Sequence, residues 1–273
     1  MTDSKAWGFP KFNDLLGTAY GSTQQEVALA GAGITFIDPY LIAGMALLQD
    51  VLEEEGRSLI LQDCEPTVAS YLRRMNFPYR GNRELLPPES YEESPVLLEL
   101  FRICNKQDGD TVARHVLHSL QDRLGYPRVL AHNVFNALSE AFQNSLEHAQ
   151  SSPFVIMQIF KRQDPSQQRL VLCVLDRGQG VLSSLKKNPK YSHLTEDRQA
   201  VELALQKGVS GVFTDHTRGQ GLWRLQDICK RYGGRFILHS GSSQVYIKAG
   251  EPFYWYSSPF IPGTQLRLEL HPI

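Results

Sequence analysis

The sequence predicts an α+β protein: a C-terminal α/β sandwich, in which helices cover a mixed, largely antiparallel sheet, follows a small α/β unit. Three observations predict this class. Residues 25–80 alternate strand and helix patterns, residues 110–149 carry long amphipathic helices, and residues 153–178 hold two apolar runs around a polar turn. The chain has 273 residues, 42% hydrophobic and 21% charged, which is enough for two small domains.

The first unit has the order strand, helix, strand, helix. "VALAGAGITFID" (27–38) predicts a strand region, and Pro39 then opens a helix, because proline is tolerated in a first helical turn. That helix has apolar residues at helical spacing and ends at Gly56. A strand over 57–64 and a helix over 65–77 follow. Parallel strands need a crossover connection, so this order predicts a parallel pair.

A linker follows the first unit. "GNRELLPPESYEESP" (81–95) has three prolines, several charges and no apolar periodicity, which is typical of a linker. We therefore place a first domain at 1–86, the linker at 87–95 and a second domain at 96–273.

The second domain opens with helices and continues with strands. A helix is predicted from Asp110 to Gly125, and a long helix follows it. "PFVIMQIFKR" (153–162) and "QRLVLCVLDRG" (168–178) predict an antiparallel hairpin at the centre of a sheet. "RFILHSGSSQVYIKAG" (235–250) predicts a second hairpin turning at Gly241, and "TQLRLELH" (264–271) predicts a last strand.

Composition excludes several classes of protein. With 28 Lys+Arg against 29 Asp+Glu, the chain lacks the basic excess that non-specific nucleic-acid binding requires. The four cysteines are far apart in the sequence, without metal-ligand spacing, so we expect reduced, buried thiols. No signal-peptide pattern or apolar run of membrane-spanning length is present, which predicts a soluble cytoplasmic protein without membrane contact.

One helix carries polar residues on a single stripe. In "LSEAFQNSLEHA" (138–149), Glu140, Asn144 and His148 follow one another at intervals of four residues, so they lie on neighbouring lines of one helix face. Such a stripe commonly marks a solvated face. Asn and His are mediocre helix formers, however, which favours a ligand site.

Two glycine pairs stand at the ends of elements. "LDRGQGV" places Asp176, Gly178 and Gly180 after an apolar strand, and "TRGQGL" places Gly219 and Gly221 before an amphipathic helix. Neither pair completes a G-x-G-x-x-G motif, so the Rossmann interpretation fails. The unpaired N–H groups at the start of the second helix form an anion site, and a carboxylate beside glycines can accept a hydrogen bond from an amino-bearing ring such as adenine.

These three motifs, E-x-x-x-N-x-x-x-H, D-x-G-x-G and G-x-G-L, together resemble the GHKL (Bergerat-fold) ATPases, and among them the histidine-kinase-like ATPase domain of anti-sigma-factor serine kinases. The resemblance covers about residues 100–273. It implies ATP and Mg²⁺ as ligands. The roles that it implies are Asn144 as the Mg²⁺ ligand, Glu140 as general base, Asp176 as acceptor of the adenine amino group, and nucleotide contacts from His148, Gly178, Gly180, Thr217, Arg218, Gly219, Gly221, Leu222 and Thr264.

The first unit resembles the STAS domains of bacterial regulators, through "ITFIDPYLIAGMALL" and "LQDCEPTVASYLRRMNF". In kinase-switched members, the turn after the Asp carries a Ser or Thr that accepts phosphate. Here the turn reads Asp38-Pro39-Tyr40-Leu41, with no hydroxyl except the Tyr40 phenol, so a docking or scaffold role is expected instead.

The segment between the glycine pairs, residues 181–218, contains a predicted helix, "LTEDRQAVELALQKG" (194–208), and is interpreted as a lid over the nucleotide, hinged near Gly208 to Gly211. Thr217 and Arg218 are candidate phosphate contacts, whereas the charge of Lys187 is expected to be solvated. His115 and His118 lack the surroundings of a phosphoacceptor histidine and are expected to be structural.

Two functions follow as hypotheses. The first is an ATP- and Mg²⁺-binding regulatory protein that hydrolyses ATP or transfers phosphate to a protein Ser or Thr, with a STAS-domain or other regulatory protein as partner or substrate. The second is a nucleotide-gated interaction module with little or no turnover. A homodimer that closes on ATP is a more distant alternative.

Overall fold

The computed structural model describes residues 6–7, 19, 22–85, 96–148, 151–160, 168–211 and 219–271. Its centre is a five-stranded sheet in the order β5-β6-β7-β9-β8. The strands are β5 (Val96–Arg102), β6 (Phe154–Phe160), β7 (Arg169–Leu175), β8 (Gly234–Lys248) and β9 (Tyr254–Leu270).

All neighbouring strands of this sheet are antiparallel. The α+β class is therefore confirmed, but the prediction of a mixed sheet is wrong. The hairpins β6–β7 and β8–β9 each reverse the strand direction. The two helices between β5 and β6 return the chain so that these strands are antiparallel as well.

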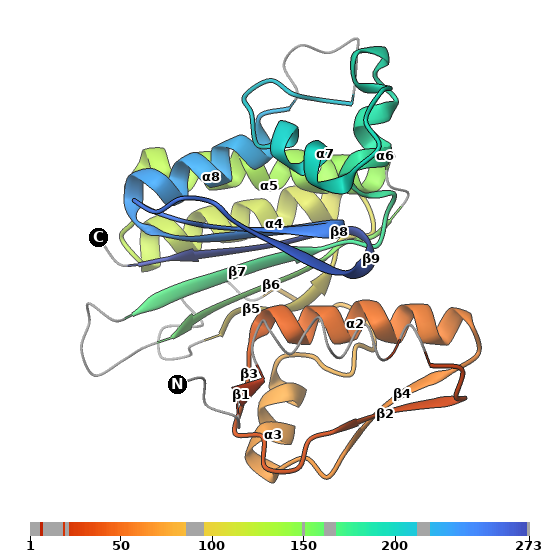
Figure 1. Ribbon diagram of the computed structural model, residues 1–273. Helices are drawn as coiled ribbons and strands as arrows, with labels where there is room; N and C mark the ends of the chain where they lie inside the picture. The colour runs from red at the N-terminus through yellow and green to blue at the C-terminus, as the bar shows by residue number, and fades with distance from the viewer. Residues whose placement is uncertain are drawn as a thin grey trace.

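Helices cover one face of the sheet. The layer contains α4 (Lys106–His118), α5 (Arg128–His148) and α8 (Gly221–Tyr232), with the short π-helix η2 (Ser119–Arg123) continuing α4 (Figure 1). The shorter elements α6 (Gly180–Lys186), η4 (Pro189–Tyr191) and α7 (Asp197–Ala204) extend this layer at one end. Alternate sheet residues such as Val155, Met157, Leu172 and Val174 pack against it in one apolar cluster.

The second predicted hairpin does not exist. Residues 234–248 form the single strand β8, and the chain turns between β8 and β9 instead. Gly241, at φ 63°, forms an irregularity where the register shifts between Ser240 and Ser243. The Asp197 carboxylate on α7 accepts hydrogen bonds from the Ser242 N–H and hydroxyl at 2.8 and 2.9 Å. Glycine here therefore marks a β-bulge rather than a turn.

The N-terminal unit has the predicted strand–helix order. Strand β2 (Glu26–Ala30) pairs in parallel with β4 (Ser58–Gln62), and β1 (Ala6–Trp7) pairs in parallel with β3 (Phe36–Ile37). The crossover from β2 to β4 contains α2 (Pro39–Glu54), and α3 (Pro66–Arg74) follows β4. The region 27–38, expected to be one strand region, thus contributes to two small sheets.

Helix α2 packs on the face of the central sheet opposite to α4, α5 and α8 (Figure 1). Its apolar residues form one cluster with residues on the sheet face turned toward α2, among them Phe154, Ile156, Val171 and Cys173. The sheet therefore lies between two helical layers, which explains why β6 and β7 are apolar on both faces. The proposed linker 87–95 lies outside the described residues, but the two parts that it connects share this core.

A buried ion pair fastens the start of α2 to β9. The Asp38 side chain caps α2 by accepting a hydrogen bond from Tyr40 N at 2.9 Å, and its other oxygen lies 3.2 Å from Arg267 Nη2. Arg267 also pairs with Glu269 at 3.0 Å. All three charged side chains are buried, at 8% exposure or less. Tyr40 is buried completely, which removes the one hydroxyl of this turn from the surface.

Two further predictions concern exposure. All four cysteines are free thiols, but only Cys173 and Cys229 are buried; Cys64 is half-buried and Cys104 is exposed. The expectation of buried thiols is thus wrong for Cys104.

Within the described parts of the chain, no helix combines the length and the apolar character that crossing a membrane requires.

The substitution Arg267→Met should destabilise the protein by about 3–5 kcal/mol, because it leaves the buried Asp38 carboxylate without its cation and leaves Glu269 with the longer contact to Arg235. The free energy of unfolding in urea measures this. Arg231→Met is the matched control, since Arg231 pairs with Asp227 on an exposed helix surface and should cost less than about 1 kcal/mol.

The double variant Asp38→Asn/Arg267→Met should cost less than the sum of its single substitutions, because no unpaired Asp38 charge remains. Additive costs would show that the pair contributes no coupling.

Candidate functional site

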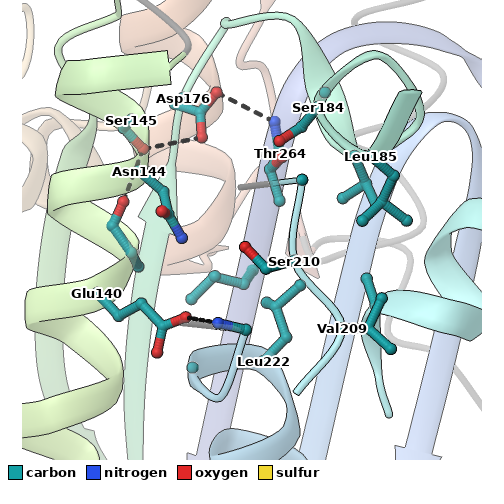
Figure 2. A pocket seen from close by; sticks show the side chains of 18 of the residues that line it. Glu140, Asn144, Ser145, Asp176, Ser184, Leu185, Val209, Ser210, Leu222 and Thr264 are labelled. Carbon is teal, nitrogen blue, oxygen red and sulfur yellow. Dashed lines mark hydrogen bonds between the residues drawn. The ribbon is translucent and has the colours of Figure 1, made fainter. Parts of the chain in front are cut away.

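A cleft opens between α5, α6, the segment after α7 and the start of α8, above β7 and β9 (Figure 2). Its empty space, which includes volume open to solvent, is about 980 Å³. Much of the wall is apolar. The apolar lining residues are Ala137, Ala141, Val174, Val181, Leu185, Ala204, Val209, Leu222, Leu225 and Leu266.

Asp176 lies at one end of this cleft and is buried. Its Oδ1 accepts hydrogen bonds from Gly178 N at 2.8 Å and Thr264 N at 3.3 Å, and its Oδ2 lies 3.1 Å from Ser145 Oγ. Its backbone oxygen accepts a hydrogen bond from Gln265 Nε2 at 3.0 Å. One residue thus connects α5, the loop after β7 and β9.

Burial raises the pKa of Asp176 above its ordinary value, and the hydrogen bonds from Gly178, Ser145 and Thr264 partly oppose the shift. The Ser145 hydroxyl lies between two acceptors, because its Oγ is also 3.0 Å from Ala141 O. A hydroxyl has one proton, so it donates to one of these oxygens at a time. The carboxylate therefore keeps capacity to accept a further hydrogen bond from a ligand.

Gly180, the second glycine of the first pair, allows the loop after β7 to pack closely against β8 and β9. Gly180 has φ +75°, and a Cβ there would come within 2.9 Å of Ser240 Oγ and 3.2 Å of Gly263 O. The Ser240 hydroxyl in turn accepts a hydrogen bond from Val181 N at 2.9 Å. Glycine is thus required where α6 begins, since any side chain would push the loop away from β8 and β9.

Glu140 lies at the other end of the cleft in Figure 2, with Asn144 between it and Asp176. The Glu140 Oε1 accepts hydrogen bonds from Gly219 N at 2.8 Å and Gln220 N at 3.0 Å. These N–H groups stand at the start of α8, where a helix has unsatisfied donors and the positive end of its dipole. The predicted anion site is therefore occupied by a carboxylate of the protein itself.

Asn144 is exposed in the cleft, one helical turn after Glu140. Its amide supplies one neutral oxygen ligand, which suits Mg²⁺ only when phosphate oxygens complete the coordination. No cluster of three or more His, Cys, Asp or Glu side chains suited to a metal ion occurs among the described residues.

The segment expected to be a lid is mostly a fixed part of the fold. Residues 180–205 form α6, η4 and α7, whose apolar side chains belong to the core. Residues 208–211 then cross beside Gly219, which precedes α8: Gly208 N donates to Gly219 O at 3.0 Å, and Asn188 Nδ2 donates to Ser210 O at 3.0 Å. Glycine at 219 is required by this contact, because a Cβ there would come within 2.3 Å of Val209 O.

Most of the predicted site residues lie in this one cleft. Those that line it are Glu140, Asn144, Asp176, Gly180, Gly219, Gly221, Leu222 and Thr264. Gly178 contributes through its N–H to Asp176. Thr217 and Arg218 lie outside the described residues, and so does the side chain of His148, the last residue of α5. Lys187 is exposed and is not among the lining residues.

Sequence reasoning missed Ser145 and Gln179. Ser145 directly follows Asn144, and its contact with Asp176 has no signal in a linear sequence. Gln179 stands between the two glycines of the first pair and lines the cleft; its buried Nε2 has no hydrogen-bond partner among the described residues. A buried donor without a partner is costly, so a ligand acceptor would stabilise it.

The two histidines expected to be structural lie on α4. His115 is buried, and its Nε2 is 2.8 Å from Leu97 O on β5. Burial lowers the pKa of His115 below its ordinary value. His118 is exposed, and neither residue lines the cleft.

Comparison of the chain with protein-family models and with curated proteins finds no match. Function is therefore inferred from the cleft itself.

Asp176→Asn should change the pH dependence of stability. A raised pKa favours the protonated folded form, so the contribution of Asp176 is fully present below its unfolded pKa of about 3.9 and is lost as the pH rises through its folded pKa. The Asn variant does not ionise, and its stability relative to the wild type should increase over that interval.

Urea unfolding at a series of pH values from 4 to 8 measures the difference. A difference that stays constant with pH would contradict the ionisation of a buried Asp176.

Proposed function

We propose that the protein is an ATP- and Mg²⁺-binding regulatory protein of the GHKL (Bergerat-fold) type, nearest to the anti-sigma-factor serine kinases, with a STAS-like N-terminal unit. The observation that carries the proposal is that residues from three separate motifs, Glu140 and Asn144, Asp176 and Gly180, and Gly219 and Gly221, line one cleft.

The end of the cleft at Asp176 suits a purine with an exocyclic amino group. The carboxylate accepts a hydrogen bond from such a group, and the apolar residues Val174, Val181 and Leu185 provide walls for a flat ring. The unpartnered Nε2 of Gln179 offers a donor to a ring nitrogen or a phosphate oxygen. Adenine satisfies these groups together, which supports ATP as the ligand.

The end at Asn144 and α8 suits phosphate groups. The N–H groups of Gly219 and Gln220 already bind an anion, the Glu140 carboxylate. Mg²⁺ bound between Asn144 and the phosphates would neutralise the charge that develops when the terminal phosphoryl group is transferred.

Glu140 is the candidate general base. In phosphoryl transfer to a Ser or Thr hydroxyl, the hydroxyl oxygen bonds to the terminal phosphorus, the bond from that phosphorus to the bridging oxygen breaks, ADP leaves with the electron pair, and Glu140 accepts the hydroxyl proton. With water as nucleophile, the same residue serves hydrolysis. The protein substrate would be a STAS-domain or other regulatory protein.

A nucleotide-gated interaction module is the second candidate. It is favoured by the hydrogen bonds of Glu140, because they hold Oε1 on the backbone N–H groups of Gly219 and Gln220 and not on a nucleophile. In that case nucleotide binding would change partner affinity with little turnover.

Asn144→Ala should abolish Mg²⁺-dependent nucleotide binding, because it removes the amide oxygen proposed to bind the metal. Isothermal titration with ATP, with and without Mg²⁺, measures this. Gln143→Ala is the matched control: the neighbouring amide is exposed, donates to Glu147 at 2.8 Å and does not line the cleft, so its variant should bind normally. Equal affinities for both variants would contradict the proposed metal site.

Glu140→Ala separates the two candidate functions. If Glu140 is the base, ATP consumption should fall by about 10²- to 10⁴-fold while nucleotide binding persists. Phosphate release and phosphosites on co-purifying proteins are the measurements. Unchanged consumption would remove Glu140 from catalysis and leave the interaction module.

A further inference from the structure

A side chain from a different helix binds the residues that lead into α8. Helix α8 has no side-chain cap of its own and no acidic residue in its first turn. Glu140 of α5 accepts hydrogen bonds from its N-cap residue and the residue before it, with Oε1 at 3.0 Å from Gln220 N and 2.8 Å from Gly219 N. These are the donors to which the proposed function assigns nucleotide phosphate.

The absence of a side chain at position 221 permits this contact. A Cβ on Gly221 would lie 3.3 Å from the Glu140 carboxyl carbon and 3.4 Å from Oε2, which is tighter than most real contacts. It would also lie 3.4 Å from Ala137 O, so α8 begins directly against α5. The carboxylate therefore lies on the donors that the proposed function assigns to phosphate.

We infer that Glu140 is an internal competitor of phosphate: a bound nucleotide must displace its carboxylate from Gly219 and Gln220, and this displacement frees the carboxylate to act as a base. The inference rests on the proposed function and adds its regulation.

Two physical reasons support competition rather than coexistence. A carboxylate and a phosphate are both anions, and their repulsion rises steeply at contact distance in a partly buried site. Each N–H group also has one proton, so Gly219 and Gln220 cannot donate strongly to both anions. Once displaced, Glu140 loses the two hydrogen bonds that occupy Oε1, so this oxygen can face a nucleophile only when phosphate is present.

The experiment compares the dissociation constants of adenosine and of ADP with Mg²⁺ by isothermal titration. Adenosine has no phosphate and cannot compete with Glu140. Glu140→Gln should bind ADP on the order of tenfold more tightly than the wild type, because a neutral amide holds the two N–H groups less strongly than a carboxylate does. Its affinity for adenosine should be unchanged. Circular dichroism confirms that the variants are folded.

Two further variants identify the cause. Glu147→Gln removes an exposed charge from the same helix and should leave both affinities unchanged. Glu140→Asp keeps the charge but is one methylene shorter, so it cannot reach Gly219 and Gln220 in the same geometry. Under competition it should also bind ADP more tightly than the wild type; under simple charge repulsion it should not.

The outcomes separate this inference from the proposed function. ADP binding that is equal or weaker in Glu140→Gln, with adenosine and wild-type ADP binding intact, overturns the competition and leaves the proposed function standing. An equal gain for adenosine and ADP overturns it as well. Binding of ADP by Glu140→Gln but not by the wild type supports an especially strong competition. No binding of any nucleotide by either protein overturns both.

Discussion

The cleft depends on one buried carboxylate. Asp176 accepts hydrogen bonds from the loop after β7 and from β9, and it contacts Ser145 on α5, so it fixes the distance between the helical layer and the sheet at this point. Burial raises the pKa of Asp176, because a charged carboxylate is costly to remove from water. The same residue joins three elements around this end of the cleft and places a carboxyl group in its wall.

The opposite end of the cleft is organised by the start of α8. Glu140 joins α5 to α8 through backbone donors, and the segment 208–211 packs on the glycine between them. Groups that would bind a phosphate thus already belong to a network that holds the helices together. Under the proposed function, a phosphate at this end would have to replace the contacts of Glu140, whereas the end at Asp176 requires no such replacement.

The sequence predicts the periodic parts of the fold well, because apolar spacing reports directly on α2, α3, α5 and the hairpin β6–β7. The prediction from sequence fails where the same residues are compatible with two different local structures. The glycine and serines at 241–243 suit a turn, yet Asp197, far away in sequence, stabilises them as a bulge within β8. The length of the segment after Gly180 suggests a lid, but the apolar residues of α6, η4 and α7 belong to the core.

In the site, too, some residues could be predicted from the sequence and others could not. Spaced motifs identify Glu140, Asn144 and Asp176, because residue type and interval suffice for a helix stripe and a strand end. Ser145 and the contact of Glu140 with the start of α8 depend on how α5 meets its neighbours, and no interval in the sequence encodes that. The burial of Tyr40 has the same origin, because it follows from the position of α2 against the sheet.

The two-sided apolar character of β6 and β7 makes the N-terminal unit part of the fold rather than an appendage. A fragment that starts at Val96 would leave Phe154, Ile156 and Val171 facing water, together with Arg267 deprived of Asp38. An exposed sheet face of this kind is an aggregation surface. A chain shortened to its C-terminal part would therefore aggregate through this face. Biochemical experiments on the cleft require a protein that includes residues 22–85.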